Sequence, residues 1–275
     1  LAMEQVYKYL LVGGMPEAVS IFAATGSYRK SGAVVSSIIQ GYQDDFSKYA
    51  RKVDPTLLRQ TLLSVARQIG DKFVYSHVEG NYRSYEVKKA LEMLCDAGLI
   101  IPTYHTDANG IPLGAEINEK IIKYVMLDSG VVLGLLGIED DTDELVKEIM
   151  VASSTDLVDK GHLSEMVAGT ELVKYMSPDK KHQLYYWQNT AKGTISEVDY
   201  IIAHGKEIIP IEVKSGVRGS MASMYVLMKN PQKNINSGIR CSLENFGKFL
   251  SPGGKPVRII PLYAISNIFE DRIIL

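Results

Sequence analysis

The sequence predicts an α/β protein with two folded units, the first mainly helical and the second built on a mixed β-sheet. Three observations predict this class. Apolar residues recur at helical spacing in the N-terminal part, short apolar runs of β type dominate the C-terminal part, and an acidic break, EDDTDEL at 139–145, lies between them. With 275 residues, 46% of them hydrophobic, the chain can bury a core in each unit. We therefore expect domains at 1–145 and 146–275.

The N-terminal part is expected to begin with helices. Residues 1–53 follow a helical pattern that is interrupted at GGMPE, residues 13–17, where the glycines end one helix and the proline suits the first turn of the next. An amphipathic helix from Pro55 to Gly70 follows. Because the chain opens at Leu1 in mid-pattern, without a capping residue, we expect it to be a piece of a longer protein.

A third helix and a β-hairpin complete the first domain. The helix is predicted in SYEVKKALEMLCDAGLI, with Ser84 as its N-cap and Gly98 as its stop. Two β-rich segments, IIPTYHTDANGIPLGAEI and KIIKYVMLD, then flank an Asn-Gly turn signal. Helices followed by a hairpin predict a winged-helix unit.

The third helix is the one that a winged helix would place in a DNA major groove. Lys88, Lys89 and Arg83 are available there to contact phosphates. Winged helices also serve as protein-docking spacers, and two lysines on a solvated helix face are ordinary. Both interpretations of this helix stay open.

The second domain is predicted to alternate helices and strands. Its elements, in order, are a helix at about 161–176, the strand LYYWQ, a hairpin formed by EVDYII and EIIPIEV, a helix at about 219–229, the strand GIRCSL and the strand VRIIPLYAI. The segment from Glu212 to Ile239 is long enough for a crossover helix, so the strands that it joins can run parallel. A mixed sheet flanked by helices follows.

Charged residues inside the apolar hairpin mark the candidate site. In IIPIEVKSG, Glu212 and Lys214 point to the same face, and Asp199 on the neighbouring strand can reach both. Two buried carboxylates repel each other, and one lysine neutralises only one of them. A divalent metal resolves this conflict. Oxygen ligands without nearby His or Cys suit Mg²⁺ or Mn²⁺.

A further metal ligand is expected from the preceding helix, GHLSEMVAGTELVKYM. Glu165 and Glu171 are about 240° apart around this helix, so they do not face the same site. We favour Glu165, because its apolar neighbours can pack on the sheet while it lines the edge. The tripeptide Glu-x-Lys is weak evidence by itself, since Glu86-Val87-Lys88 repeats it on a helix, where residues two apart point in different directions.

The candidate site resembles the motif of the PD-(D/E)XK nuclease superfamily, which has a restriction-endonuclease-like fold with the core order αβββαβ. The residues that carry this resemblance are Glu165, Asp199 and Glu212-Val213-Lys214. Nearly the whole chain resembles the C-terminal region of a group of prokaryotic AAA+ ATPases, in which a P-loop domain precedes a winged helix and a nuclease-like domain. The segments that carry this resemblance are GGMPEAV, KKALEMLCDAGLI, KYVMLDSGV, EVDYII and IEVKSG. No G-x-x-x-x-G-K-[ST] occurs in these residues, so we expect no ATP hydrolysis by this chain alone.

The resemblance implies a mechanism and partners. Asp199 and Glu212 would hold Mg²⁺ or Mn²⁺, Glu165 would be a third or water-mediated ligand, and Lys214 would position a water or stabilise charge on phosphorus. The substrate would be DNA, and the N-terminal ATPase domain would be a partner within the same protein; the oligomeric state stays open. The alternative is a regulatory module that binds DNA or protein on the same scaffold without cutting.

Overall composition excludes several other functions. Lys and Arg total 30 against 32 Asp and Glu, so the whole chain is not a polyanion binder, although an excess of basic residues at 214–258 could hold a phosphate backbone or form a solvated rim. Cys95 and Cys241 are far apart, which disfavours a disulfide framework, and the histidines lack metal-ligand spacing and are expected in loops or at the surface. Without a signal peptide or an apolar run long enough to cross a bilayer, we expect a cytoplasmic protein without membrane contact.

Overall fold

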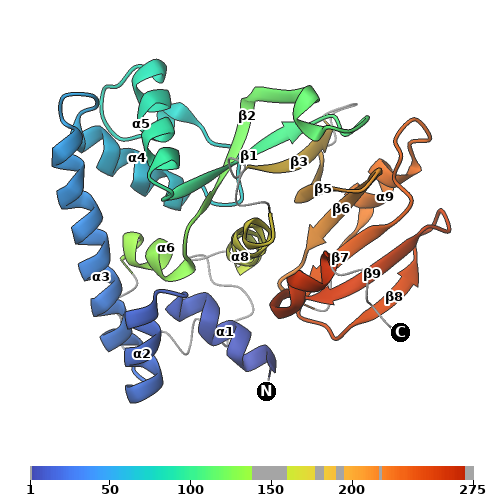
Figure 1. Cartoon of the computed structure of the whole chain (residues 1–275), viewed down its shortest axis with the longest axis horizontal. Coiled ribbons are helices and arrows are strands. Elements are labelled where there is room, and N and C mark those ends of the chain that lie inside the picture. Colours follow the sequence, from blue (N-terminus) through green and yellow to red (C-terminus); the bar gives the residue numbers. More distant parts are fainter. Residues whose placement is uncertain (1, 138–159, 177–182, 190–194, 217–218, 270–275) are drawn as a thin grey trace. The chain divides into compact units, whose positions relative to one another are not determined.

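The computed structural model describes residues 2–137, 160–176, 183–189, 195–216 and 219–269, which form a mixed α/β fold (Figure 1). The chain divides into two compact units. The first contains residues 1–101 and 124–167, and the second contains residues 102–123 and 168–275. The acidic break at 139–145, and the boundary predicted beside it, lie outside the described residues.

The first unit is mainly helical, and helices occupy most of residues 1–53 as predicted. Among the described residues, no helix has the length and apolar character needed to cross a membrane. The helices in this part of the chain are α1 (Ala2–Val12), α2 (Pro16–Thr25), α3 (Tyr28–Asp45), η1 (Phe46–Tyr49), α4 (Pro55–Arg67), η2 (Tyr75–His77), α5 (Ser84–Asp96) and α6 (Ser129–Leu135).

Local capping explains where α4 and α5 begin and end. The carboxylate of Asp54 accepts a 2.8 Å hydrogen bond from the backbone N–H of Thr56, directly before Pro55 opens α4. The expected N-cap of α5 was wrong by one residue: Arg83 is the N-cap and Ser84 is the first helical residue. Glu86 Oε2 accepts from Arg83 N at 2.8 Å, which replaces the missing side-chain cap. Gly98 follows the helix with φ +72°, as a C-terminal stop requires.

Two segments that carry the family resemblance meet inside the first unit. Asp128 Oδ2 accepts a 2.5 Å hydrogen bond from Gly14 N, and its Oδ1 caps α6 by accepting from Val131 N at 3.1 Å. Gly13 has φ +77°, and a Cβ there would lie 2.2 Å from Oδ1 of the same carboxylate. The glycine pair therefore has a structural role, because it lets the α1–α2 turn approach the carboxylate that starts α6.

The second unit contains a four-stranded sheet with the order β2-β1-β3-β4 (Figure 1). Strand β1 pairs in parallel with β3, and β3 pairs antiparallel with β4. The predicted hairpin strands are present as β1 and β2, but the Asn109-Gly110 turn signal lies in a longer connection that includes the short helix η3. The bounds are β1 (Ile100–Thr106), η3 (Leu113–Glu116), β2 (Ile117–Met126), β3 (Leu184–Asn189) and β4 (Ser196–Val198).

A second, five-stranded sheet has the order β5-β6-β7-β9-β8. Strands β5 and β6 form the predicted antiparallel hairpin, and β6 runs parallel to β7 after the crossover helix α9, as predicted. The expectation of a single mixed sheet was wrong: the predicted strand EVDYII is divided at Asp199 into β4 and β5, and LYYWQ, as β3, pairs with β1 and β4 in the other sheet. Strand β8 was not predicted, and it pairs antiparallel with β9 at the sheet edge. The bounds are β5 (Tyr200–His204), β6 (Glu207–Val213), α9 (Ala222–Lys229), β7 (Gly238–Ser242), β8 (Gly247–Leu250), β9 (Pro256–Pro261) and η5 (Leu262–Ile268); helix α8 (Lys160–Lys174) precedes β3.

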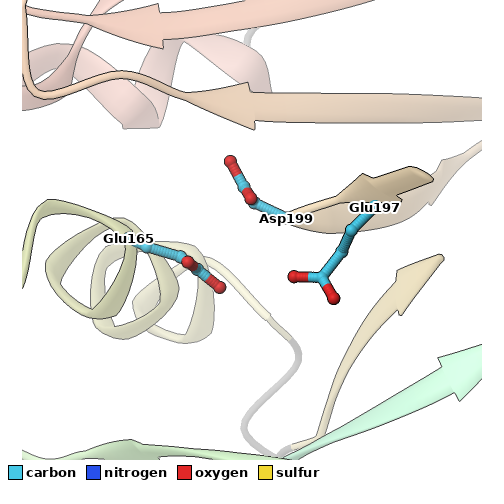
Figure 2. Close-up of side chains that lie close together, drawn as sticks. All are labelled: Glu165, Glu197 and Asp199. Atoms are coloured by element: carbon cyan, nitrogen blue, oxygen red, sulfur yellow. The ribbon is translucent and has the colours of Figure 1, made fainter. Parts of the chain in front are cut away.

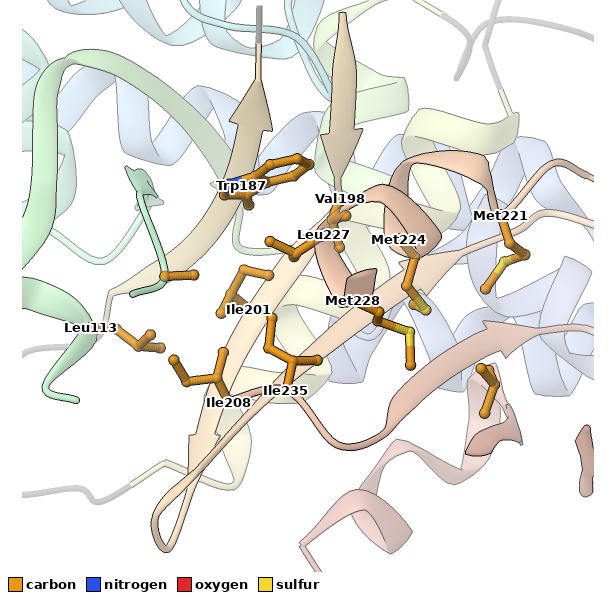
Figure 3. Close-up of a cluster of buried hydrophobic side chains, with 12 residues drawn as sticks. Leu113, Trp187, Val198, Ile201, Ile208, Met221, Met224, Leu227, Met228 and Ile235 are labelled. Atoms are coloured by element: carbon orange, nitrogen blue, oxygen red, sulfur yellow. The ribbon is translucent and has the colours of Figure 1, made fainter. Parts of the chain in front are cut away.

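A buried apolar cluster holds this unit together (Figure 3). Trp187 from β3 is 6% exposed and lies in the cluster, and its neighbour Tyr186 is fully buried, so these aromatic residues of the predicted strand LYYWQ pack in the core. Helix α9 contributes Met224, Leu227 and Met228, which face the sheet residues. Burial of such side chains contributes roughly 1.5–3 kcal/mol each to folding. The remaining members are Ala108, Leu113, Val198, Ile201, Ile208, Met221, Ile235 and Val257.

Candidate carboxylate and lysine site

Asp199 lies at the point where the chain passes from one sheet to the other. It forms a bend between β4, which pairs with β3, and β5, which pairs with β6. Its Oδ2 accepts a 2.6 Å hydrogen bond from the backbone N–H of Val213 at the end of β6. The bend is therefore tied to β6 directly beside Glu212.

Glu212 and Lys214 form an ion pair at the end of β6. Glu212 is 5% exposed, and its Oε1 accepts a 2.7 Å hydrogen bond from Lys214 Nζ. Its Oε2 is buried and has no hydrogen-bond partner within the part of the chain that the structure describes. The Lys214 N–H donates to Cys241 O at 2.8 Å, which fixes the lysine backbone to β7. One oxygen of Glu212 is thus left for another ligand.

The two carboxylates oppose each other's ionisation. Burial, with a smaller contribution from the nearby Asp199 carboxylate, raises the pKa of Glu212 to about 8, although Lys214 acts to lower it. Burial also raises the pKa of Asp199, against the lowering effects of the Val213 N–H and of Lys123 and Lys214. Desolvation and like-charge repulsion both disfavour two anions here, so an added cation would stabilise the ionised pair.

Glu165 belongs to a group of three carboxylates (Figure 2). Glu165 lies on α8 and is 9% exposed, and Glu197 and Asp199 belong to the strand segment around the bend. Each residue offers one carboxylate oxygen, and these oxygens lie within 4.8 Å of one another. Such a group has the hard oxygen donors that a divalent cation prefers. The competing residue Glu171 is ion-paired with Lys174 one turn along the same helix.

Sequence patterns did not identify Glu197 and Lys123. Lys123, on β2, is 3% exposed and ion-paired with Glu197 Oε1 on β4. Its Nζ also lies 5.2 Å from the centroid of the Tyr186 ring. The two residues are 74 positions apart in the chain, so local spacing could not pair them.

The loop after Lys214 is held by Arg240 on β7. Arg240 is 6% exposed, and its Nε donates to Glu244 Oε2 at 2.7 Å. Its terminal nitrogens lie 3.4 Å from the carbonyl oxygens of Gly216 and Gly219. A Cβ on Gly219 would lie 2.7 Å from Cδ of Lys214, so the absence of a side chain there leaves room for the lysine stem.

Several basic residues at 214–258 have structural partners. Lys255 Nζ donates to the backbone oxygens of Met228 and Ile235 at 2.7 and 2.6 Å, and Lys233 Nζ donates to Asn109 Oδ1 at 2.7 Å. Lys229 and Lys248 are exposed, whereas Arg218 is outside the described residues. The excess of basic residues in the sequence is therefore only partly an exposed charge.

The basic residues of α5 and the histidines were also assigned positions from the sequence. Lys88, Lys89 and Arg83 are exposed on or beside α5, where Val87 is buried. The expectation that the histidines lie in loops or at the surface was wrong for His105, which is 8% exposed on β1 with Nε2 3.0 Å from Gln188 O.

The structure therefore defines this chain as a mixed α/β protein with a buried site of carboxylates and lysines. Residues 3–142 match the family model of a domain of unknown function, DUF8612, and the chain, half of which this match covers, belongs to that family. Residues 160–262 match the model of a second domain of unknown function, DUF4143, and contain all four predicted site residues. Comparison with curated proteins and with solved structures finds no match.

Proposed function

We propose that the chain carries a metal-dependent, nuclease-like module that hydrolyses DNA phosphodiester bonds, with Asp199 and Glu212 as ligands of Mg²⁺ or Mn²⁺. The observation that carries the proposal is the buried Oε2 of Glu212, which has no hydrogen-bond partner among the described residues. Leaving a buried carboxylate oxygen unsatisfied is costly. A cation shared with Asp199 would remove this cost.

The residues present fit a hard divalent cation. Glu165, Glu197 and Asp199 bring carboxylate oxygens within 4.8 Å of one another, the kind of donor that Mg²⁺ and Mn²⁺ prefer. Glu212 is not part of this group, but its carboxylate interacts with that of Asp199. Burial is the main cause of the raised pKa values of Asp199 and Glu212, and neighbouring carboxylates add to it. Lys214 and Lys123 supply two charges against these four acids, and a divalent ion would balance the rest.

When bound, the metal would polarise the phosphodiester and lower the pKa of a coordinated water. The chain's own residues supply the positioning. Glu212 holds the Lys214 ammonium at 2.7 Å, at the end of β6, where it would orient a water or stabilise charge that grows on the phosphate oxygens. The Val213 N–H keeps the Asp199 carboxylate beside β6.

The element order supports this assignment. Helix α8, strand β3, the β5–β6 hairpin, the crossover helix α9 and β7 occur in the order αβββαβ that the resemblance to PD-(D/E)XK nucleases implies, although β3 and the short strand β4 belong to the other sheet. Strand β6 ends in Glu212-Val213, and Lys214 follows it. The succession α4, α5, β1 and β2 supports the winged-helix assignment. By the same resemblance we propose DNA as substrate and an AAA+ ATPase domain as the partner.

Incubation of the chain with single-stranded, duplex and branched DNA in the presence of Mn²⁺ tests the proposal. We expect cleavage that EDTA abolishes and that Asp199→Ala or Lys214→Ala reduces at least about a hundredfold, the size of a lost electrostatic group in a dry site. Lys206→Ala, an exposed lysine between β5 and β6, is the matched control. Absence of cleavage together with absence of Mn²⁺ binding by calorimetry would overturn the proposal.

The ion pair between Lys214 and Glu212 favours one alternative, a binding or regulatory module on the same scaffold. An ammonium that already pairs with the carboxylate stabilises the site in part without a metal. This alternative predicts salt-dependent DNA binding that Asp199→Ala leaves unchanged, with no cleavage under any condition. The nuclease proposal predicts instead that Mn²⁺ binding is lost in that variant.

A further inference from the structure

We propose that Lys123 is a positioning residue of the carboxylate site: its ammonium holds the Glu197 carboxylate beside Asp199 and supplies a fixed positive charge with which a divalent cation competes. This inference rests on the proposed function, because it concerns the same metal site. It adds a residue from β2, outside the segment that contains the predicted site.

Lys123 has a buried side chain, and burial of an ammonium is costly unless a partner compensates its charge. Its side chain is 4% exposed, and it is ion-paired with Glu197, whose side chain is 30% exposed. The Tyr186 ring offers its face at 5.2 Å from Nζ. Tyr186 itself is fixed on β3 by its ring contact with His105, at 5.7 Å between centroids. A charge that is buried among such fixed neighbours has a defined position.

The same ammonium acts on Asp199. Lys123 favours the ionised form of the Asp199 carboxylate, whereas Glu197 disfavours it. Glu197 in turn belongs to the carboxylate group of Figure 2, with oxygens within 4.8 Å of those of Asp199 and Glu165. Lys123 therefore has two opposite effects on a cation there: it orders one of the ligands and it repels the ion.

The origin of Lys123 in the chain makes this arrangement informative. Residues 3–142, which match DUF8612, include Lys123, whereas Asp199, Glu197 and Glu212 lie in residues 160–262, which match DUF4143. In the structure, residues 102–123 belong to the second unit, where β1 pairs with β3. Strand β2, in the region that matches DUF8612, thus supplies a positive charge to the carboxylate site in the region that matches DUF4143.

Lys123→Met in the full chain separates charge from packing, because Met keeps most of the stem and removes the ammonium. Lys123→Arg keeps the charge, and Lys120→Met, an exposed lysine on the same strand, is the matched control. Calorimetry with Mn²⁺ alone is the first readout. We expect Lys123→Met to bind Mn²⁺ roughly tenfold more tightly, because a nearby like charge is gone. Lys123→Arg and Lys120→Met should match the wild type.

Thermal unfolding in EDTA is the second readout, and it does not depend on a metal. Lys123→Met should lower the unfolding midpoint by roughly 5 °C, since Glu197 loses its partner. The double variant Lys123→Met/Glu197→Gln should recover most of this loss, because the uncompensated charge is removed as well.

The outcomes distinguish the two proposals. Unchanged Mn²⁺ binding by Lys123→Met, when the wild type binds Mn²⁺, overturns the role of Lys123 and leaves the metal site intact. Weaker binding supports the positioning of Glu197 and overturns the competition between the ammonium and the cation. Absence of Mn²⁺ binding by the wild type overturns the proposed function. In that case the unfolding data decide on Lys123: recovery in the double variant supports the ion-pair role, and additive losses overturn it.

Discussion

Asp199 is bound to the end of β6 directly beside Glu212, at the open end of the β5–β6 hairpin. Tyr200 pairs with Ile211, and the two acids are the residues that directly precede Tyr200 and follow Ile211. The hydrogen bond from Val213 N to Asp199 Oδ2 is 2.6 Å long. The Asp199 carboxylate disfavours the ionised form of Glu212, and this pair therefore makes the folded chain sensitive to protons and to cations.

The first prediction concerns the pH dependence of stability without metal. The pKa of Glu212 rises from an ordinary 4.5 to about 8 on folding, so between these values the folded state holds a proton that the unfolded state has released. This contribution to stability is complete below the unfolded pKa and is lost as the pH rises through the folded pKa. The free energy of unfolding in EDTA should therefore fall between pH 5 and pH 8, by at most about 1.4 kcal/mol per pH unit and proton.

Glu212→Gln is the control for this pH dependence. The amide has nothing to titrate, so denaturant unfolding of this variant should give a flatter profile over the same range. Glu207→Gln changes an exposed glutamate on the same strand and should keep the wild-type slope. A profile that rises with pH in the wild type would contradict the raised pKa of Glu212.

The second prediction separates the charge of Asp199 from its hydrogen bond. An Asn carbonyl oxygen can still accept from Val213 N, whereas Ala cannot. Asp199→Asn should therefore lose Mn²⁺ affinity but keep nearly the wild-type unfolding midpoint. Asp199→Ala should lose the affinity and also about 1–3 kcal/mol of stability, because the Val213 N–H loses its partner. Equal stability of the two variants would show that the hydrogen bond does not matter.

Local patterns were sufficient for most of the fold. Helices such as α4 and α5 follow from apolar spacing and terminal residues, and the parallel β6–β7 pair follows from the length of the crossover. Pairing between distant segments was beyond such patterns. The sequence does not show that β3 pairs with β1, and β8 is too short and too polar at Lys248 to stand out.

The candidate site was predicted to a similar extent. Alternation along β6 placed Glu212 and Lys214 on one face, and the hairpin placed Asp199 opposite, since these relations depend on neighbours in one turn. Glu197 and Lys123 meet only through the folded β2-β1-β3-β4 sheet. A buried ion pair of this kind has no periodic trace in the sequence.

The third prediction concerns Gly219, which makes room for the Lys214 stem. Gly219 has φ +142°, and its added Cβ would lie 2.7 Å from Lys214 Cδ. Gly219→Ala should cost about 1–3 kcal/mol of stability through backbone strain, and it should displace the ammonium, so that Mn²⁺-dependent cleavage falls more than stability does. Gly216→Ala, whose Cβ would have no atom within 4 Å, is the matched control. Comparable cleavage by both variants would remove Gly219 from the site.

The fourth prediction tests the role of the GGMPEAV segment in the first unit. A Cβ on Gly13 would lie 2.2 Å from Asp128 Oδ1 and 2.7 Å from Gly130 N, and the glycine has φ +77°. The backbone nitrogen cannot move away as a flexible side chain could, so Gly13→Ala should lose about 2–4 kcal/mol of stability in denaturant unfolding. Gly26→Ala has a similar φ of +66° but no atom within 4 Å of its Cβ, so it should lose only the cost of the backbone conformation, about 1 kcal/mol. The difference in unfolding free energy between the two variants therefore measures the contact of the Gly13 turn with Asp128 and α6. Equal losses would mean that Gly13 is needed only for the backbone conformation of the turn.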